Sequence, residues 1–283
     1  MRDVILLDRL GKTNGATVHE YTERDVILYH LGIGARAEDL DFVYEGVNGG
    51  LKVCPMFAVV PMLDPLMKLL PQFNVPFRGV LHGEQAIFLE RPIPSRGMFL
   101  TTARVPAVYD KGKAAVLIVE TETTDKSGKL LFRTRVSLFC PGLGGFGGDP
   151  GPKSQVLEIP KGRKPDFEIA QDTLDSQAVL YRLSGDPNPL HVDPIAASFA
   201  GFRRPILHGL CTFGFVGRAV LRGICGNRVG LIREFGVRFA SPVYPGETIT
   251  TQGWNMGDGM HFLRAACAGR EVLSNAYVRI KEV

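Results

Sequence analysis

Alternating apolar and polar positions predict two similar pairs of strands, one in each half of the chain. Residues 114–121 and 130–139 are mainly apolar and flank a short polar turn at 126–129. Residues 261–267 and 272–280 repeat this arrangement in the second half. Such segments around a short turn are typical of antiparallel hairpins. We therefore predict one hairpin in each half.

Three segments have the pattern of helices. Residues 26–31 and 178–183 follow threonine and acidic residues that resemble helix start signals, Thr22-Glu23 and Thr173-Leu174-Asp175. The segment 210–221 is long, largely apolar and begins after a His-Gly pair. A helix that is apolar on most sides must be covered by other elements, and a curled antiparallel sheet would cover it. These elements predict an α+β fold.

Several short motifs recur in the same order about 150 residues apart, which indicates a duplicated domain. We therefore predict an N-terminal domain at 1–141, a linker at 142–162 and a C-terminal domain at 163–283. The matched segments are Leu28–Gly32 with Leu180–Ser184, Leu81–Gly83 with Leu207–Gly209, and Phe88–Thr102 with Phe239–Thr251.

The linker contains a false nucleotide-binding motif. Gly142, Gly144 and Gly147 have the spacing Gly-x-Gly-x-x-Gly. That motif binds a pyrophosphate only when a helix follows it. Pro150 and Pro152, with further glycines around them, exclude a helix start at this place. The segment is therefore interpreted as a Gly/Pro-rich connection between the domains.

Composition and charge argue against several classes of protein. The chain has 283 residues, of which 45% are hydrophobic and 22% charged, and its net charge of +4 is too small to indicate a nucleic-acid-binding surface. Five scattered cysteines without a Cys-x-x-Cys pair indicate reduced thiols in an intracellular compartment, with neither a disulfide framework nor a zinc site. The sequence has no apparent membrane span or signal peptide. The C-terminal Lys-Glu-Val differs from a peroxisomal Ser-Lys-Leu signal.

The segment 184–191 carries the most informative chemistry. Its sequence, Ser-Gly-Asp-Pro-Asn-Pro-Leu-His, places Asp186, Asn188 and His191 within six positions. The glycine and the two prolines fix an irregular backbone. A carboxylate and an imidazole on one rigid turn can transfer protons to and from carbon or water. The alternative is a simple capping turn, because Asp and Asn favour turns for local hydrogen-bonding reasons.

Gly209 stands where the apolar helix is expected to begin. The first backbone N–H groups of a helix lack an intrahelical partner, and together with the helix dipole they can stabilise negative charge on a carbonyl oxygen. Close helix packing is the alternative role for this glycine. His208 is a candidate ligand or base, although a buried histidine more often hydrogen-bonds to the backbone.

The first half lacks this acid–base set, so we expect one active site. Gly83 is expected to begin a helix, like Gly209. The apolar content of this half, with Met56, Met62 and Met67, suits a pliable pocket for the apolar part of a substrate, and core filling is the alternative for each methionine. Aligning the two halves on Tyr29 and Tyr181 places Gly34, Arg36 and Asp39 opposite Asp186, Asn188 and His191.

One long motif is similar to the signature of the hydratase 2 group of MaoC-like hot-dog proteins. It runs Tyr181-x-Leu183-Ser184-Gly185-Asp186-x-Asn188-Pro189-Leu190-His191 and is followed by Pro205-Ile206-Leu207-His208-Gly209. The resemblance covers essentially the whole chain and is closest to the two-domain hydratase 2 unit of peroxisomal multifunctional enzymes. It implies a double hot-dog fold, with two antiparallel sheets that each wrap around a central helix. It also implies reversible hydration of trans-2-enoyl-CoA to (3R)-3-hydroxyacyl-CoA in fatty acid β-oxidation, without a metal or other cofactor.

The resemblance also assigns roles to residues. It makes Asp186 and His191 the catalytic pair, Asn188 their support and Gly209 a donor to the thioester oxygen. An acyl-CoA partner, a peroxisomal location and an origin in a multifunctional chain are implied as well, and a homodimer is compatible with it. The implied substrate contacts are His82, Gly83, Lys111, Pro187, Pro189, Leu190 and Phe239.

Two other functions are considered. A hot-dog thioesterase would release the free CoA thiol, whereas a hydratase consumes the enoyl absorbance and leaves the thioester intact. A non-catalytic acyl-CoA binding module would bind without turnover, and its binding would survive the loss of Asp186 and His191.

Overall fold

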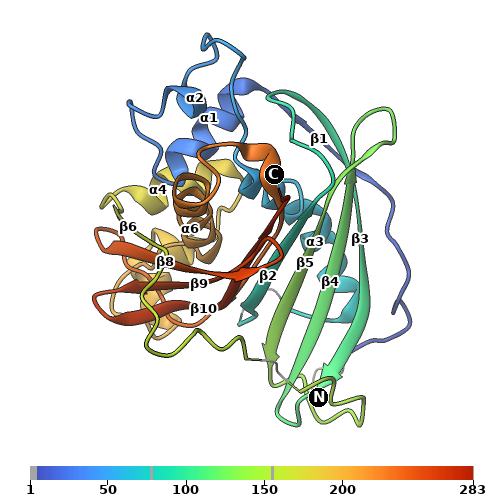
Figure 1. Ribbon diagram of the computed structural model, residues 1–283. Coiled ribbons are helices and arrows are strands. Elements are labelled where there is room, and N and C mark those ends of the chain that lie inside the picture. The colour runs from blue at the N-terminus through green and yellow to red at the C-terminus, as the bar shows by residue number, and fades with distance from the viewer. Residues whose placement is uncertain (1–4, 77–78, 154–155, 283) are drawn as a thin grey trace.

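The described residues of the protein form one antiparallel sheet of ten strands with helices packed against it (Figure 1). The structure is a computed structural model that describes residues 5–76, 79–153 and 156–282. The strands are β1 (Thr17–Tyr21), β2 (Leu81–Leu89), β3 (Gly97–Asp110), β4 (Ala114–Thr124), β5 (Leu130–Pro141), β6 (Phe167–Asp172), β7 (Ile232–Phe239), β8 (Thr248–Gly257), β9 (Met260–Cys267) and β10 (Arg270–Ile280). The α-helices are α1 (Glu23–Gly32), α2 (Leu40–Val43), α3 (Leu63–Leu69), α4 (Gln177–Tyr181), α5 (Pro194–Phe199) and α6 (Gly209–Gly223). Short 3₁₀ turns are η1 (Pro55–Val59), η2 (Leu70–Phe73), η3 (Arg182–Ser184), η4 (Pro189–His191) and η5 (Val229–Leu231).

The two halves of the sheet have mirrored strand orders. The sheet runs β1-β3-β4-β5-β2 in the first half and continues β7-β10-β9-β8-β6 in the second. The central strands β2 and β7 pair from Glu84 with Arg238 to Phe88 with Glu234. The two antiparallel sheets expected from the sequence are thus the two five-stranded halves, and they join edge to edge into one continuous sheet. This joint satisfies the backbone donors and acceptors that two free edge strands would expose.

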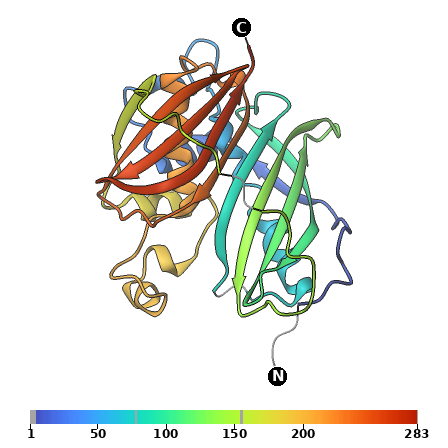
Figure 2. The same ribbon diagram turned by 60° about the horizontal axis from the view of Figure 1, so that its bottom comes forward.

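The central helix predicted in the second half is α6. Every residue from Leu210 to Leu221 is buried, and the strands of the second half curve around the helix (Figures 1 and 2). Two glycines let other elements approach its backbone closely. A Cβ on Gly214 would lie 2.3 Å from Ile33 Cγ2, and a Cβ on Gly217 would lie 2.3 Å from Met56 Sδ. The helix is therefore fixed against the first half of the chain.

The central helix that the resemblance implies for the first half is broken into short pieces, and the sequence pattern did not locate it. Turn η1, helix α3 and turn η2 follow one another between Pro55 and Phe73 and pack on the strands of that half (Figure 1). Prolines within this segment interrupt the helical hydrogen-bond pattern. Met56 and Met62 are fully buried in the core, whereas Met67 is 38% exposed.

Two predicted helix starts are wrong. Gly83 lies within β2, next to a register shift between His82 and Glu84, and therefore begins no helix. Helix α4 begins after Ser176 rather than after Thr173. The start of α1 is confirmed, because Thr22 is its N-cap and forms a capping box with Asp25.

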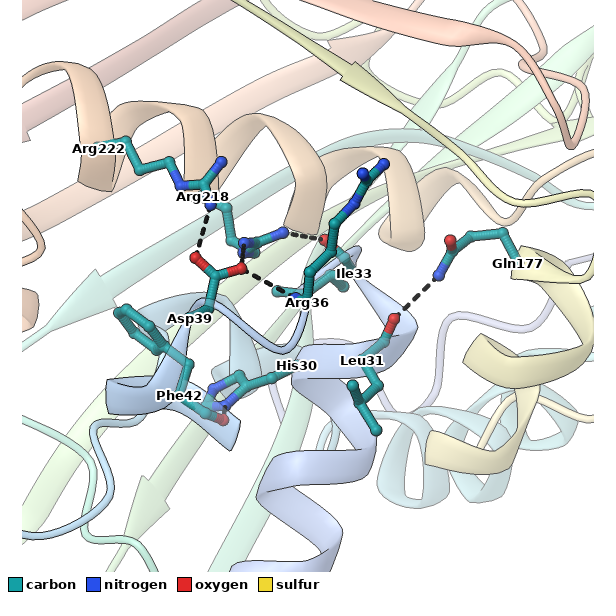
Figure 3. A network of polar contacts seen from close by, with 9 residues as sticks. All are labelled: His30, Leu31, Ile33, Arg36, Asp39, Phe42, Gln177, Arg218 and Arg222. Atoms are coloured by element: carbon teal, nitrogen blue, oxygen red, sulfur yellow. Dashed lines mark hydrogen bonds and ion pairs between the residues drawn. The ribbon is translucent and has the colours of Figure 1, made fainter. Parts of the chain in front are cut away.

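Polar contacts join the first half to α6 and α4 (Figure 3). Asp39 accepts hydrogen bonds from Arg218 Nη2 at 2.6 Å and Arg222 Nη2 at 2.5 Å, both on α6. Gln177 Nε2 on α4 donates to the carbonyl oxygens of Leu31 (3.0 Å) and Gly32 (2.7 Å) at the end of α1. Asp39, which the alignment of the two halves places opposite His191, thus anchors α6 to the first half of the chain.

Other expectations agree with the described residues. The two hairpins form as β4–β5 and β9–β10. Residues 142–153 and 156–162 contain neither helix nor strand, so the false nucleotide-binding motif is not followed by a helix. All five cysteines are buried, and none of them forms a disulfide. Among the described helices, none is both long and apolar enough to cross a membrane.

Candidate active site

A tight loop after α4 carries Asp186 and His191. Gly185 ends turn η3 with a φ of 121°, a conformation that favours glycine. Asp186 Oδ1 accepts a hydrogen bond from Asn188 N at 3.2 Å, and Asn188 Oδ1 accepts one from Leu190 N at 3.1 Å. The capping turn considered from the sequence is therefore present. Its local hydrogen bonds fix the same loop that presents the candidate catalytic groups.

His191 is held with one ring nitrogen engaged. Its Nδ1 lies 2.9 Å from the carbonyl oxygen of Ile206, and the residue is only 8% exposed. Because a carbonyl can only accept, Nδ1 carries the proton and Nε2 of the neutral ring is left as a base. Burial lowers the pKa of His191, and the contacts with Ile206 and Asp186 oppose this shift only in part. The ring is therefore neutral near pH 7.

His208 is the residue that connects the parts of the site. Its ring stacks on His191 with centroids 3.7 Å apart and an interplanar angle of 28°. Its Nε2 lies 3.3 Å from the carbonyl oxygen of Asp186, and it is the N-cap residue of α6. The expectation of a buried histidine bonded to the backbone is confirmed. Burial, with His191 as a second cause, lowers the pKa of His208 to about 2, so it adds no charge beside His191.

The carboxylate and the two imidazoles form a compact group. Within the described part of the chain, Asp186, His191 and His208 are the one set whose potential ligand atoms all lie within 4.8 Å of one another. A metal ion needs ligand lone pairs that converge on one point. The stacked rings direct their in-plane lone pairs along nearly parallel planes instead. The arrangement suits proton transfer better than shared coordination.

Gly209 begins α6 at the seam between the two halves of the sheet. Its N–H is one of the first-turn donors that have no intrahelical acceptor. A Cβ at this position would lie 3.1 Å from the ring of Phe239, at the end of β7. The Phe239 ring in turn meets the His82 ring edge-on, with centroids 4.9 Å apart. Gly209, Phe239 and His82, which were named separately from the sequence, therefore lie side by side.

His82 brings a further unpartnered group to this seam. Its Nε2 is buried without a hydrogen-bond partner among the described residues, and burial lowers the pKa of the ring to about 4. Gly83 follows it in β2, and a Cβ there would lie 3.2 Å from the carbonyl oxygen of Ser137. The first half thus contributes one edge of the site through β2.

Lys111 is not brought into contact with these groups. It lies in the β3–β4 turn, where its Nζ donates to the carbonyl oxygen of Pro150 and lies 5.7 Å from the centroid of the Tyr109 ring. The strand registers place this turn at the same end of the sheet as His82, three strands away. On the catalytic loop, Pro187 and Pro189 are exposed and Leu190 is half-buried.

An open groove lies far from the candidate site. Its volume is about 460 Å³, and it lies at the opposite end of the second half, next to the end of α6 and the start of β9. It is lined by Arg163, Asp166, Phe167, Gly223, Ile224, Asn255 and His261. The candidate catalytic groups therefore do not share this groove.

Each half of the chain matches a known protein family. Residues 19–142 match the MFE-2 hydratase 2 N-terminal domain, and residues 157–275 match the MaoC like domain. The chain is 40% identical to peroxisomal multifunctional enzyme type 2 of Drosophila melanogaster, over 98% of this chain and 49% of that protein. It therefore spans about half the length of this relative. It is also 40% identical to probable enoyl-CoA hydratase 2 of Dictyostelium discoideum, over 84% of this chain and 83% of the relative.

Solved structures agree with these matches. A MaoC-like dehydratase from Phytophthora capsici covers 98% of both chains, with a TM-score of 0.85 and 31% identity. A Mycobacterium tuberculosis protein described as a double hotdog fold gives a TM-score of 0.61 at 14% identity, which supports the fold alone. The α+β double hot-dog fold expected from the sequence is thus confirmed. The chain belongs to the MaoC-like family, in the two-domain form that carries a hydratase 2 N-terminal domain.

Proposed function

We propose that the chain is a hydro-lyase that adds water reversibly to trans-2-enoyl-CoA and forms (3R)-3-hydroxyacyl-CoA. The observation that carries this proposal is the compact group of Asp186, His191 and His208 at the start of α6, next to the first-turn N–H of Gly209. Relatives named enoyl-CoA hydratase 2 and 3-hydroxyacyl-thioester dehydratase support the same reaction class.

The residues present suit each step of this addition. The Gly209 N–H donates to the thioester oxygen, where negative charge develops as the double bond is attacked. Asp186 and His191 Nε2 carry the two protons. One proton leaves the water whose oxygen bonds to C3, and one is delivered to C2. His208 positions both groups for these transfers, because it stacks on the His191 ring and contacts the backbone of Asp186.

The named relatives also support a wider context for the reaction. Proteins named as peroxisomal multifunctional enzymes and as a peroxisomal enoyl-CoA hydratase support a role in β-oxidation and a peroxisomal location. We further propose that residues 163–283 form the catalytic domain, with 142–162 as its linker. In this proposal, residues 1–141 bind the acyl tail.

A series of trans-2-enoyl-CoA thioesters of increasing length tests the reaction. The expected result is loss of the enoyl absorbance, no release of free CoA thiol, and a product of R configuration at C3. Release of thiol would identify a thioesterase. Binding of the thioesters without turnover would identify a binding module, and either outcome overturns the proposal.

The pH dependence of kcat/KM tests the role of His191. Because burial lowers its pKa below the ordinary value of about 6.5, the ring stays a neutral base until the pH falls below that value. We expect kcat/KM to be level through neutrality, with an acid limb centred below pH 6.5. An acid limb centred above 6.5 would contradict this assignment of the base.

Two substitutions of Gly209 distinguish the effect of its N–H donor from the effect of its missing side chain. Proline is tolerated at the first position of a helix, and His208 has the extended ψ of 136° that a residue before proline requires. Gly209→Pro replaces the N–H with the proline ring, which includes a Cβ, whereas Gly209→Ala adds a Cβ and keeps the donor. We expect turnover of Gly209→Pro to fall about 10²–10³-fold below that of Gly209→Ala, the usual loss for one oxyanion donor. Equal turnover of the two variants would show that this N–H has no catalytic role.

A further inference from the structure

We propose that Arg203, Arg204 and Tyr244 form a subsite for the phosphate groups at the nucleotide end of coenzyme A. This inference rests on the proposed function, because it assigns a place to the part of the substrate that is remote from the reacting thioester. The three residues lie in two loops, one before α6 and one between β7 and β8.

Two guanidinium groups share one aromatic ring at this place. Arg203 Cζ lies 4.6 Å from the centroid of the Tyr244 ring, and Arg204 Cζ lies 5.0 Å from it. Both arginines are exposed and Tyr244 is half-buried. Contact with the ring attracts each cation and limits the freedom of its long side chain. The two groups are therefore held in place before any ligand arrives.

The positive charge of the pair is not balanced by an ion pair in the part of the chain that the structure describes. Within the described residues, neither Arg203 nor Arg204 forms an ion pair with a carboxylate. The carboxylate on the same loop, Glu247, accepts a hydrogen bond from Tyr244 N at 2.9 Å and bonds from Arg270 Nη2 at 2.8 and 2.9 Å. Two neighbouring cations without a counter-charge repel each other. A bound phosphate removes this repulsion and accepts hydrogen bonds from both guanidiniums.

The pair is joined directly to the candidate active site. Leu207 N donates to Val243 O at 2.7 Å, so the arginine loop runs beside the loop of Tyr244. Ile206 in the same segment holds His191 through its carbonyl oxygen. Gly209 is five positions after Arg204 in the chain, a span of at most about 18 Å for an extended chain. The pair is therefore a short distance from the thioester position.

The arginine pair also lies at the same end of the sheet as the candidate active site, which suits a long substrate. The registers place the end of β7, the start of β8 and the start of β2 at one end of the sheet, the end where the candidate active site lies. Coenzyme A carries a diphosphate and a ribose phosphate, separated from its thioester by the uncharged pantetheine arm. With the thioester at Gly209, the arm reaches the exposed arginines along this end of the molecule.

Binding of coenzyme A itself tests the subsite without relying on turnover. The double variant Arg203→Gln/Arg204→Gln removes both charges from residues that lie outside the catalytic group. By calorimetry we expect its Kd for coenzyme A to rise about 10–100-fold, as for the loss of one or two charge-assisted hydrogen bonds. We expect the Kd for pantetheine, which lacks these phosphates, to stay unchanged. Weakened binding of 3′-dephospho-coenzyme A by the same variant would assign the diphosphate to the pair, and unchanged binding would assign the ribose phosphate.

A matched control removes two positive charges elsewhere. Lys126 and Lys129 are exposed in the β4–β5 turn, at the opposite end of the sheet. Lys126→Gln/Lys129→Gln should leave the Kd for coenzyme A unchanged. The subsite is overturned if the arginine variant binds coenzyme A as the wild type does, or if both double variants weaken binding equally. Failure of the proposed function would show differently, as wild-type protein that binds coenzyme A through the arginines without hydrating any enoyl thioester.

Discussion

Asp186→Asn should lower kcat for enoyl-CoA hydration by about 10²–10⁴-fold, the usual contribution of a positioned acid or base. The amide oxygen of asparagine can still accept the hydrogen bond from Asn188 N, so the loop keeps its shape while the proton-transferring group is lost. His191→Ala should cost a similar factor. Since the two groups act on one substrate as a unit, the double variant should cost far less than the product of the single losses. Steady-state kinetics on one enoyl-CoA measures all three variants.

A neighbouring aspartate provides the control for this prediction. Asp193 caps α5, where its Oδ1 accepts a hydrogen bond from Ile195 N at 2.8 Å. It lies outside the group formed by Asp186, His191 and His208. Asp193→Asn should therefore retain nearly full activity. If Asp186→Asn keeps the activity of Asp193→Asn, with both proteins folded, the catalytic role of Asp186 is refuted.

Asp39→Ala should lower the free energy of unfolding by about 3–5 kcal/mol, as expected when one partner of a buried ion pair is removed. The Asp39 side chain is 8% exposed and that of Arg218 is 5% exposed. The substitution leaves the Arg218 guanidinium buried without its counter-charge, with one hydrogen bond to Ile33 O at 3.2 Å (Figure 3). Denaturation by urea, followed by circular dichroism, measures the loss.

Asp41→Ala is the matched control, because the Asp41–Lys52 pair is exposed by 39% and 38%. An exposed pair of this kind contributes about 0–1 kcal/mol. Equal losses of stability for Asp39→Ala and Asp41→Ala would contradict the anchoring role of Asp39.

The anchor also predicts how stability depends on pH. Burial by itself would raise the pKa of Asp39, but the Arg36 N–H and the guanidiniums of Arg222 and Arg218 outweigh it and lower the pKa. A carboxyl with a lowered folded-state pKa stabilises the fold fully above its unfolded pKa, which is about 3.9. This stabilisation is lost as the pH falls from there through the folded-state pKa. The difference in stability between wild type and Asp39→Ala should therefore shrink below pH 4.

Local pattern predicted most of the regular elements. The hairpins β4–β5 and β9–β10 and the buried helix α6 follow from alternation, turn residues and apolar length, which are properties of neighbouring positions. The broken helix between Pro55 and Phe73 was missed because its prolines and continuous apolar residues give no helical periodicity. The comparison of Gly83 with Gly209 failed for a related reason: a shared His-Gly pair carries no information on whether a strand or a helix follows.

Local sequence likewise determined one part of the candidate site, and the tertiary structure determined the other. The local sequence determined the loop that carries Asp186 and His191. Its glycine and prolines restrict the backbone, and the side chains of Asp186 and Asn188 hydrogen-bond to backbone groups two residues further on. The tertiary structure decided which groups meet there. It stacked His208 on His191 and set Phe239 against Gly209 and His82. It also brought Asp39 into hydrogen-bonding contact with Arg218 on α6. These contacts join residues far apart in the chain, and their formation depends on the pairing of β2 with β7 and on packing, which no local periodicity encodes.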